Sequence, residues 1–172
     1  PIRPKAVSAR THRLTGNPNY DDKGHLRSDY EDVEDFGHIH IVFDDGMVAD
    51  VFASEILLGG VRNRLEVAAN NHRTICNINP NTVMQTYNER EEYFKDIYVV
   101  EKTGTKQGWS NPAPDEDYFN GYPNEMEAFY RTVAYGEEPE GSSSLGADTI
   151  AVIYSAYLSD ERGGAEVEVK TL

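Results

Sequence analysis

Two histidines, His38 and His40, stand two positions apart in a segment that alternates polar and apolar residues. On a β-strand this spacing puts both imidazole rings on one face, as in strand-borne pairs that bind a metal ion. A metal site would need a third ligand, and the spacing of the remaining His, Cys, Asp and Glu residues nominates none. We therefore expect half-exposed sheet histidines and assign no metal site.

Three common catalytic or nucleotide-binding patterns are missing from the sequence. It has no G-x-G-x-x-G turn for a dinucleotide, no G-x-x-x-x-G-K-[ST] loop for a phosphate and no G-x-S-x-G elbow for a nucleophilic serine. The single cysteine, Cys76, falls in a strand-like segment, where a buried thiol is expected. We therefore assign no catalytic residue to this chain.

A proline-rich segment from Gly108 to Tyr118 contains the only tryptophan, Trp109, and leads into a helix start at Gly121–Glu125. A long loop that ends at a helix start is suited to form one wall of a ligand pocket. The alternative is a surface loop that Trp109 pins onto the sheet. Spacing alone favours this second interpretation.

Strands must position these residues, and the sequence predicts them by period-two alternation at 5–14, 38–43, 47–53, 64–69, 74–78, 82–87, 97–101 and 165–170. Asp44-Asp45-Gly46 predicts a hairpin turn between the second and third of these segments. Because the links are short, we expect a largely antiparallel, open sheet of about seven strands.

Helical periodicity begins after Trp109. Five residues recur at three- and four-residue steps and give one apolar face: Tyr122, Met126, Phe129, Tyr130 and Val133. Gly136 closes this helix, and a second helix is expected to begin after the Ser142-Ser143-Ser144 cluster and to run to about Asp160. The fold class is therefore α+β, with helices packed on one face of the sheet. An open sheet of that size rarely leaves its other face bare, so we expect an interface there.

The composition is that of a globular protein, with 38% hydrophobic and 27% charged residues among 172. The net charge of −14 argues against nucleic acid and anionic membranes as partners, since phosphate binding needs clustered Lys and Arg. No apolar run approaches the ~20 residues of a membrane span. One cysteine cannot form an internal disulfide, which favours a reducing compartment, the cytoplasm. The acidic segment 15–35 is expected to be a solvated loop.

Several motifs, in a fixed order, resemble one protein family. They are Asp45-Gly46-Met47-Val48-Ala49, Arg64-Leu65-Glu66-Val67, Gly121-Tyr122-Pro123-x-Glu125-Met126-x-x-Phe129, Gly136-x-x-Pro139 and Tyr154-x-Ala156-Tyr157-Leu158-Ser159. Together they resemble the C-terminal domain of the glucose-fructose oxidoreductase and inositol dehydrogenase family (Gfo/Idh/MocA), which are NAD(P)-dependent sugar and polyol dehydrogenases. The segment from Trp109 to Glu116 is similar to a branch with a Gly-Trp…Pro-x-Pro-Asp-Glu insertion. Asn70-Asn71 stands where the family usually has a Gly-rich turn.

The resemblance implies that residues 1–172 form a C-terminal domain for substrate binding and oligomerisation. It also implies an N-terminal Rossmann domain upstream of Pro1 that binds NAD or NADP and carries the catalytic Lys and an Asp/His pair. On that reading this chain alone binds no cofactor and is inactive, while the intact enzyme takes a sugar or polyol and forms a homo-oligomer through the sheet face. The alternative is a non-catalytic binding or oligomerisation module.

The same resemblance nominates four substrate-binding residues in this chain: Arg62, Trp109, Tyr122 and Glu125. Arg62 would donate hydrogen bonds to substrate oxygens, and Trp109 would stack on a sugar ring. Tyr122 would hydrogen-bond a hydroxyl at the helix start. Each has a structural alternative, which is a solvated turn for Arg62, core packing for the two aromatic residues and a helix N-terminal charge for Glu125.

Overall fold

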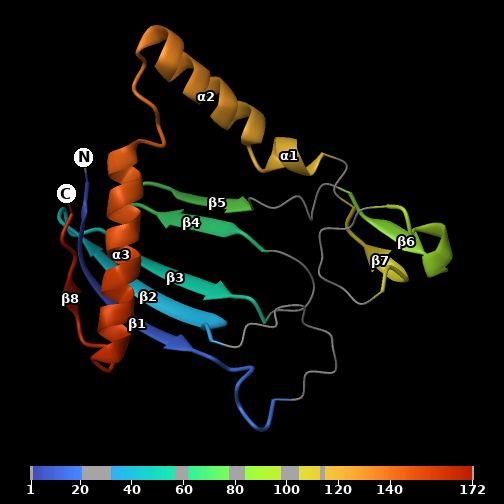
Figure 1. Cartoon of the computed structure of the whole chain (residues 1–172), viewed down its shortest axis with the longest axis horizontal. Helices are drawn as coiled ribbons and strands as arrows, with labels where there is room; N and C mark the ends of the chain where they lie inside the picture. Colours follow the sequence, from blue (N-terminus) through green and yellow to red (C-terminus); the bar gives the residue numbers. More distant parts are fainter. Residues whose placement is uncertain are drawn as a thin grey trace. The chain divides into compact units, whose positions relative to one another are not determined.

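The computed structural model describes residues 2–20, 32–56, 62–77, 84–97, 105–112 and 115–171. The chain divides into two compact units. The first comprises Pro1–Asp22, Ser28–Ile56 and Glu138–Leu172, and the second comprises Lys23–Arg27 and Leu57–Glu137. The first unit therefore joins both ends of the sequence, and the second is built from its middle (Figure 1).

A four-stranded antiparallel sheet forms the first unit, in the order β3-β2-β1-β8. Its strands are β1 (Pro4–His12), β2 (Phe36–Phe43), β3 (Val48–Ser54) and β8 (Val167–Glu168). The predicted hairpin between β2 and β3 is confirmed. Its Gly46 adopts a φ of 89°, and the Asp45 carboxylate accepts a hydrogen bond from the Met47 N–H at 2.9 Å. A left-handed residue at this turn explains why glycine follows the two aspartates.

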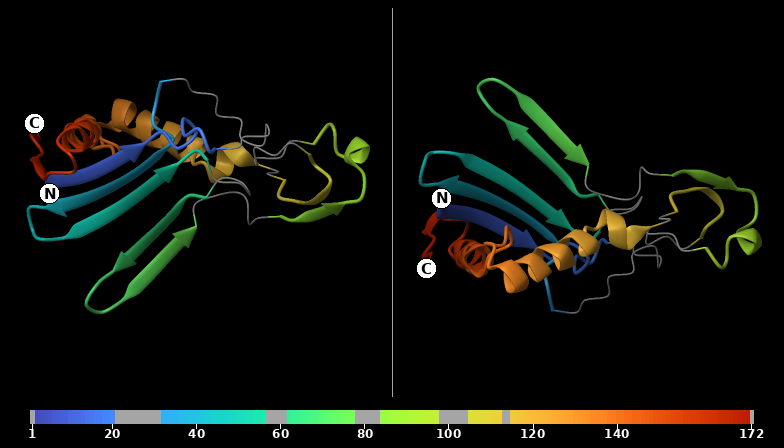
Figure 2. Two further views of the ribbon diagram at one scale, coloured as in Figure 1. Left: turned by 90° about the horizontal axis from the view of Figure 1, so that it is seen from below. Right: turned by 90° about the horizontal axis from the view of Figure 1, so that it is seen from above.

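Helix α3 (Ser143–Glu161) lies along β1 on one face of this sheet (Figures 1 and 2). The Ser142 hydroxyl caps its first turn by accepting a hydrogen bond from the Leu145 N–H at 3.2 Å. Gly163 and Gly164, with φ of 72° and 87°, reverse the chain after the helix and lead it back to β8. The predicted helix is confirmed with its glycine end, but it begins inside the serine cluster, at Ser143, because Ser142 is the capping residue.

Small side chains form the contact between α3 and the sheet. The buried core consists of Val7, Ala9, Ala156, Val167 and Val169, with Ile39, Ile41, Ala151 and Val152 packed against it. The hydroxyl of Ser159, which is fully buried, accepts a hydrogen bond from the Ala9 N–H at 2.9 Å and donates one to the Ala165 carbonyl at 2.7 Å. Ser159 thereby satisfies backbone groups of β1 and of the segment before β8 at once.

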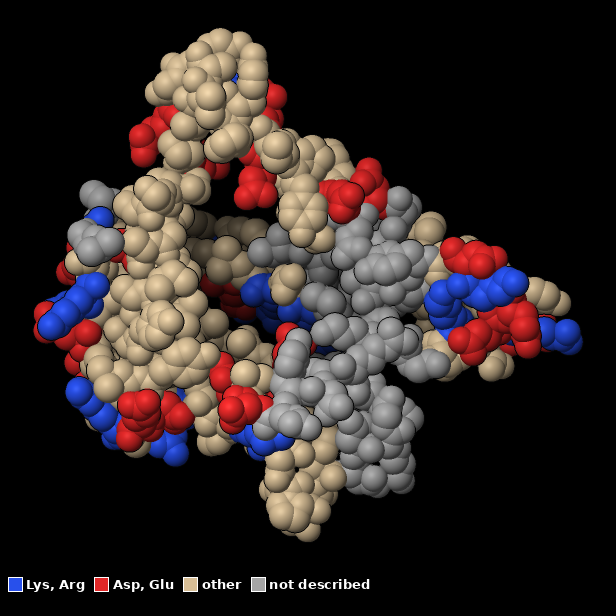
Figure 3. Space-filling model, in the orientation of Figure 1, with Lys and Arg blue, Asp and Glu red and all other residues tan. Residues whose placement is uncertain are grey.

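Two separate hairpins belong to the second unit. Strands β4 (Arg64–Ala68) and β5 (Arg73–Asn77) pair with each other, and their turn is closed by a 2.8 Å hydrogen bond from the Ala69 N–H to the His72 carbonyl. Strands β6 (Thr86–Asn88) and β7 (Gly108–Ser110) form the other pair, with the 3-10 turn η2 (Glu91–Tyr93) between them. On this second hairpin, at the right of Figure 3, acidic and basic side chains lie beside each other.

Helices α1 (Glu116–Phe119) and α2 (Tyr122–Tyr135) complete the second unit. Gly121 and Gly136 bracket α2 with φ of 82° and 69°, and the Gly136 N–H donates to the Thr132 carbonyl at 3.0 Å. The predicted helix is confirmed with its glycine C-cap. No residue of α2 is buried, so the apolar face predicted from its periodicity is exposed.

The α+β class and the antiparallel pairing are confirmed, but the single sheet of about seven strands is wrong. The described strands form three sheets of four, two and two strands. The sheet is divided because these strands pair only with their neighbours in the sequence. Strand β4 pairs with β5 across a tight turn, and β6 pairs with β7. Strand-like patterns predict extended segments without saying which edges join. Of the segment expected at 97–101, residues 98–101 lie outside the described residues, and Ile97 is not in a strand.

Two smaller expectations are also corrected. Cys76 on β5 is exposed rather than buried, because the hairpin β4–β5 has only exposed residues on its strands. The segment around Trp109, expected as a loop, begins as the short strand β7. No helix among the described residues is both long enough and apolar enough to cross a membrane.

Candidate functional site

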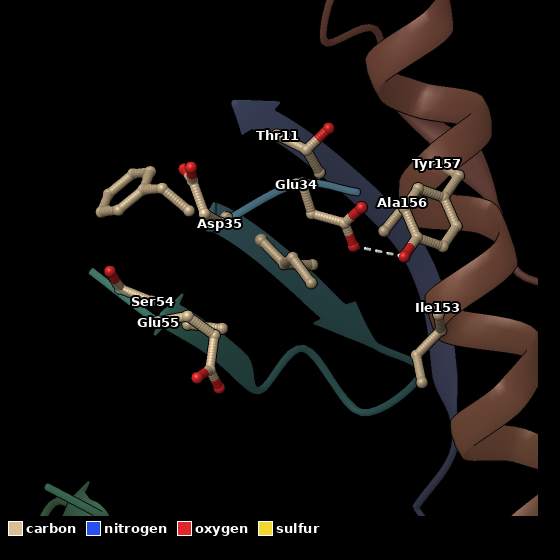
Figure 4. Close-up of a pocket in the computed structure, with 12 residues that line it drawn as sticks. Thr11, Glu34, Asp35, Ser54, Glu55, Ile153, Ala156 and Tyr157 are labelled. Carbon is tan, nitrogen blue, oxygen red and sulfur yellow. Dashed lines mark hydrogen bonds between the residues drawn. The ribbon is translucent and has the colours of Figure 1, made fainter. Parts of the chain in front are cut away.

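A cavity of about 340 Å³ lies in the first unit, between α3 and the end of the sheet where β1 finishes and β2 begins (Figure 4). Its apolar lining comes from both layers: Phe36, Ile39, Ala53, Ile153 and Ala156. Its polar lining comes mainly from the strand ends and the helix: Thr11, Glu34, Asp35, Ser54, Glu55 and Tyr157. The volume falls in the range of about 300–1,000 Å³ that is typical of small-molecule sites.

The cavity exists because α3 packs on β1 and leaves the neighbouring strands β2 and β3 less covered on the same face. The β-branched and aliphatic residues of β2 that face the helix side, such as Ile39, are only half-buried. A hydrophobic floor with a few convergent polar groups results, which is the usual composition of a ligand site.

Tyr157 and Glu34 lie in the lining of this cavity and are hydrogen-bonded to each other. The Tyr157 hydroxyl, from α3, donates a short hydrogen bond to Glu34 Oε1, from the segment just before β2 (Figure 4). This hydrogen bond is the main reason that the pKa of Tyr157 is raised above 10.0, and burial adds to it. The phenol therefore keeps its proton at neutral pH and serves here as a donor to the carboxylate.

Asp35 holds the neighbouring backbone in place. Its carboxylate accepts hydrogen bonds from the N–H groups of Leu14 and Thr15 at 2.8 and 2.9 Å, and from the Thr15 hydroxyl. Burial by itself raises the pKa of Asp35, but these hydrogen bonds outweigh it, so the pKa lies below the ordinary value of 3.8. The saturated carboxylate fixes the edge of the cavity and leaves Glu34 beside it to contact a ligand.

The four residues predicted to bind substrate all belong to the second unit. Tyr122 and Glu125 share the first turn of α2, and both are exposed. Arg62 precedes β4 and is also exposed. Among the described residues, no hydrogen bond, ion pair or ring contact joins Arg62 to the other three, so only Tyr122 and Glu125 are brought together.

Trp109 lies on β7 with 73% of its surface exposed, and its ring meets that of Tyr87 on β6 edge-on, at a centroid distance of 5.4 Å. Core packing, which was the alternative for Trp109 and Tyr122, does not describe either residue, since Tyr122 is 53% exposed. An exposed tryptophan that a cross-strand tyrosine holds at a fixed angle presents a flat apolar surface, which suits stacking on a sugar ring.

His38 and His40 lie on the face of the four-stranded sheet opposite α3. Both contact the same oxygen of Asp50 on β3, with His40 Nδ1 at 2.8 Å and His38 Nε2 at 3.4 Å. The hydrogen bond from His40 is the largest cause that lowers the pKa of Asp50 below 3.8. The His38 ring stacks on Phe52 at 4.5 Å. Half-exposed sheet histidines are confirmed, and both rings share one acidic neighbour, Asp50, across the hairpin.

The described residues do not fit a dinucleotide cofactor. A Rossmann site needs a helix that begins directly after a strand of a parallel sheet, so that its N–H groups meet the pyrophosphate. Here α2 follows α1, α3 follows the segment 136–142, and every described strand pair is antiparallel. Within the described ranges, no group of three or more His, Cys, Asp or Glu side chains has a geometry that could hold a metal ion.

Sequence reasoning missed Glu34 and Tyr157 as a pair. Tyr157 lies in the Tyr154–Ser159 motif, and Glu34 lies in the acidic segment expected to be solvated. They are 123 positions apart, so no local spacing could join them. The available signal was the tyrosine itself, since a tyrosine on a helix that packs on a sheet usually has a partner for its hydroxyl.

Comparison with known proteins finds similarity to solved structures only. No family model matches the chain, and no curated protein matches it significantly. Among solved structures, it is similar to GenD2 from gentamicin A biosynthesis in complex with NAD, with a TM-score of 0.74 and 21% identity over 98% of this chain and 42% of that one. It is also similar to a putative myo-inositol dehydrogenase from Sinorhizobium meliloti 1021, with a TM-score of 0.65 and 18% identity over 98% of this chain and 44% of that one.

A third similar structure is the WlbA dehydrogenase from Bordetella pertussis in complex with NADH and UDP-GlcNAcA, with a TM-score of 0.55 and 14% identity over 99% of this chain and 41% of that one. The chain thus spans less than half the length of each of these structures. At this level of identity the likeness concerns the fold. The chain therefore has the fold of one part of the Gfo/Idh/MocA-type dehydrogenases, the family that its motifs resemble.

Proposed function

We propose that this chain is the C-terminal domain, residues 1–172, of an NAD(P)-dependent sugar or polyol dehydrogenase. It forms a wall of the substrate pocket and the interface between subunits. The observation that carries the proposal is the fold, which is shared over 98% of this chain with GenD2, solved in complex with NAD, and over 99% with the WlbA dehydrogenase, solved in complex with NADH. In this proposal a part of the protein outside this chain supplies the NAD or NADP site, which is supported by the chain's spanning 42% of a structure solved in complex with NAD. The chain by itself is inactive.

Within this domain we propose that Arg62, Trp109, Tyr122 and Glu125 contact the substrate. Their exposure supports the proposal, since each side chain is free to meet a ligand. Polyol hydroxyls both donate and accept hydrogen bonds, so a guanidinium, a phenol and a carboxylate together match them. The aromatic surface of Trp109 matches the apolar face of a sugar ring.

The alternative is a binding or oligomerisation module without catalysis. The exposed sheet face with Phe52 supports a subunit interface under either function. A reducing, cytoplasmic location agrees with the exposed free thiol of Cys76. What separates the two functions is turnover in the complete polypeptide.

The first test measures reduction of NAD and of NADP by the complete polypeptide with a panel of sugars and cyclitols. Turnover with at least one substrate is expected, and its absence together with an absence of cofactor binding would favour the non-catalytic module. In the active protein, Trp109→Ala should raise KM for the sugar or polyol about tenfold, which corresponds to about 1.4 kcal/mol of stacking, and leave KM for the cofactor unchanged.

The matched control is Tyr93→Ala, because Tyr93 is also an exposed aromatic residue of the β6–β7 hairpin and no substrate role is proposed for it. This variant should leave both KM values unchanged. Equal changes in both KM values for Trp109→Ala would mean that Trp109 supports the fold of the hairpin and does not contact substrate.

A further inference from the structure

The β6–β7 hairpin separates its side chains into two faces. Asn88 and Ser110 are 3% and 8% exposed, so they lie on the covered face. Tyr87 and Trp109 alternate with them along the strands and stand directly opposite each other in the ladder. Both of these rings are exposed. The outer face of this hairpin is therefore a cross-strand pair of aromatic side chains.

Hydrogen bonds from the returning segment hold the backbone beneath these rings. The Asn88 side-chain amide donates to the Lys106 carbonyl at 3.4 Å, and the Gln107 side-chain amide donates to the Glu89 carbonyl at 3.1 Å. Gly108 enters β7 with a φ of 88°, a left-handed conformation that residues with a Cβ rarely adopt. The backbone on both sides of the aromatic pair is thus held, and the remaining freedom is the rotation of each side chain.

The contact with Tyr87 limits the rotation of the Trp109 indole. An exposed indole without a neighbour has several staggered rotamers available. Here the ring centroids are 5.4 Å apart and the planes meet at 67°, close to the edge-to-face arrangement that the ring quadrupoles favour. An edge-on contact covers at most one face of the indole, and Trp109 is still 73% exposed. Tyr87 therefore orients the Trp109 ring and leaves a face of it open.

We propose that Tyr87 is a positioning residue for the sugar or polyol substrate, because it holds the Trp109 indole in the orientation that stacks on the substrate ring. The inference rests on the proposed function, which gives the stacking to Trp109, and adds a residue that acts through that indole. A ring that is already ordered loses less conformational entropy when the substrate binds, so the affinity rises without a new contact. The role belongs to the ring of Tyr87 and not to its hydroxyl, since the contact with Trp109 is between rings.

The test measures the orientation of Trp109 and the substrate affinity together, in the complete polypeptide. Fluorinated tryptophan is incorporated, and the NMR resonance of Trp109 is identified by its loss in Trp109→Phe. Tyr87→Leu should move this resonance and sharpen it, because the indole then exchanges among more rotamers. The same variant should raise KM for the sugar or polyol about fivefold and leave kcat and KM for the cofactor unchanged. Tyr87→Phe keeps the ring and should match the protein without substitution in every measurement.

An unchanged fluorine resonance in Tyr87→Leu, or a changed resonance with an unchanged KM for the substrate, would overturn the proposal. A double-mutant cycle separates positioning from direct contact. In a Trp109→Ala background, Tyr87→Leu should cause no further rise in KM, because Tyr87 acts through the indole. Equal rises in both backgrounds would mean that Tyr87 touches the substrate itself, which contradicts the positioning role.

Two controls exclude a general effect on the hairpin. Tyr93→Leu, at an exposed aromatic residue of η2, should change neither the resonance nor KM. Amide hydrogen exchange in residues 91–97 should be the same in Tyr87→Leu as without the substitution, and faster exchange there would assign the rise in KM to a loosened hairpin and overturn the proposal.

Failure of the proposed function is read separately. The fluorine resonance followed during titration with the sugar or polyol gives a Kd without turnover. An inactive protein whose Kd rises about fivefold in Tyr87→Leu would reject the dehydrogenase and keep this inference. An active protein whose KM for the substrate is the same in Tyr87→Leu would keep the dehydrogenase and reject this inference.

Discussion

Asp35 joins the end of β1 to the start of β2 through a single carboxylate. Leu14 and Thr15, just past β1, donate three hydrogen bonds to it, and the residue itself is 6% exposed. Its own N–H donates to the His12 carbonyl. The connection between these strands therefore depends on an ionised side chain, and its strength depends on pH.

Acid should weaken this connection. Because the pKa of Asp35 is lowered on folding, its ionised form stabilises the protein above the ordinary value of 3.8, and this contribution is lost as the pH falls through the lower folded-state value. Asp35→Asn places an amide N–H₂ against donors and should lower the free energy of unfolding at neutral pH by about 1–3 kcal/mol. Denaturant unfolding at a series of pH values checks both statements.

The control for this experiment is Asp32→Asn, since Asp32 is exposed and lies in the same segment. It should leave the free energy of unfolding within about 0.5 kcal/mol of its original value. If Asp35→Asn kept the full pH dependence below 3.8, other carboxylates, such as Asp160 with its hydrogen bond from Thr11, would account for it.

At the scale of single residues, the sequence predicted chemistry where the signal was local. The two histidines were correctly expected on one strand face, because a two-residue spacing determines the face. Their partner Asp50 lies across a hairpin, and Glu34 meets Tyr157 from the far end of the chain. Such pairs depend on strand register and on helix docking, which single positions do not encode.

At the scale of elements, one lysine side chain of the β6–β7 hairpin, that of Lys106, stabilises the segment that follows η2. Lys106 Nζ donates to three carbonyl oxygens, those of Phe94, Lys95 and Ile97, at 3.2, 3.0 and 2.7 Å. All three donors of the ammonium group are therefore used to satisfy the carbonyls that follow η2. The hairpin has few buried side chains, so these charge-assisted hydrogen bonds are a large share of what orders it.

Lys106→Met, which keeps the length of the side chain and removes its donors, should loosen this turn. We expect amide hydrogen exchange in residues 91–97 to become about fivefold faster, which corresponds to about 1 kcal/mol for hydrogen bonds that are partly exposed. Hydrogen-exchange mass spectrometry measures this directly. Lys95→Met, at an exposed position of the same turn, should leave the exchange unchanged, and equal acceleration in both variants would contradict the role given to Lys106.

Helix ends were the elements that the sequence predicted best. Ser142 caps α3, and Gly121 and Gly136 bracket α2, because hydroxyl caps and left-handed glycines act within a few residues of the helix. Sheet membership could not be predicted in the same way. The sequence pattern of β4 is that of any strand, and nothing local to Arg64–Ala68 distinguishes a two-stranded hairpin from one part of a larger sheet.

For the whole molecule, the face of the four-stranded sheet opposite α3 is the surface proposed as a subunit interface. Phe52 is 69% exposed there beside His38, and Val48 is 56% exposed on the same strand. Phe52→Asp would bury a second carboxylate near Asp50 in that interface. We expect the dissociation constant between subunits to rise at least about 100-fold, because an unpaired charge would be desolvated.

Light scattering of the complete polypeptide measures this change as a shift to a smaller species. Phe119→Asp, at an exposed aromatic residue of α1, is the matched control and should leave the assembly intact. If the protein without any substitution is already monomeric at micromolar concentration, this face is not a stable subunit interface.

The placement of β1 at the centre of the four-stranded sheet has a consequence for how the protein is made. Val7 is fully buried, and the residues that bury it include Ala156, Val167 and Val169 near the other end of the chain. During synthesis, β1 can pair with β2 early, but Val7 stays in contact with water until α3 and β8 have left the ribosome. The first unit can therefore close only after the residues of the second unit have been synthesised, and its folding is slowed by the large sequence separation between the segments that must meet.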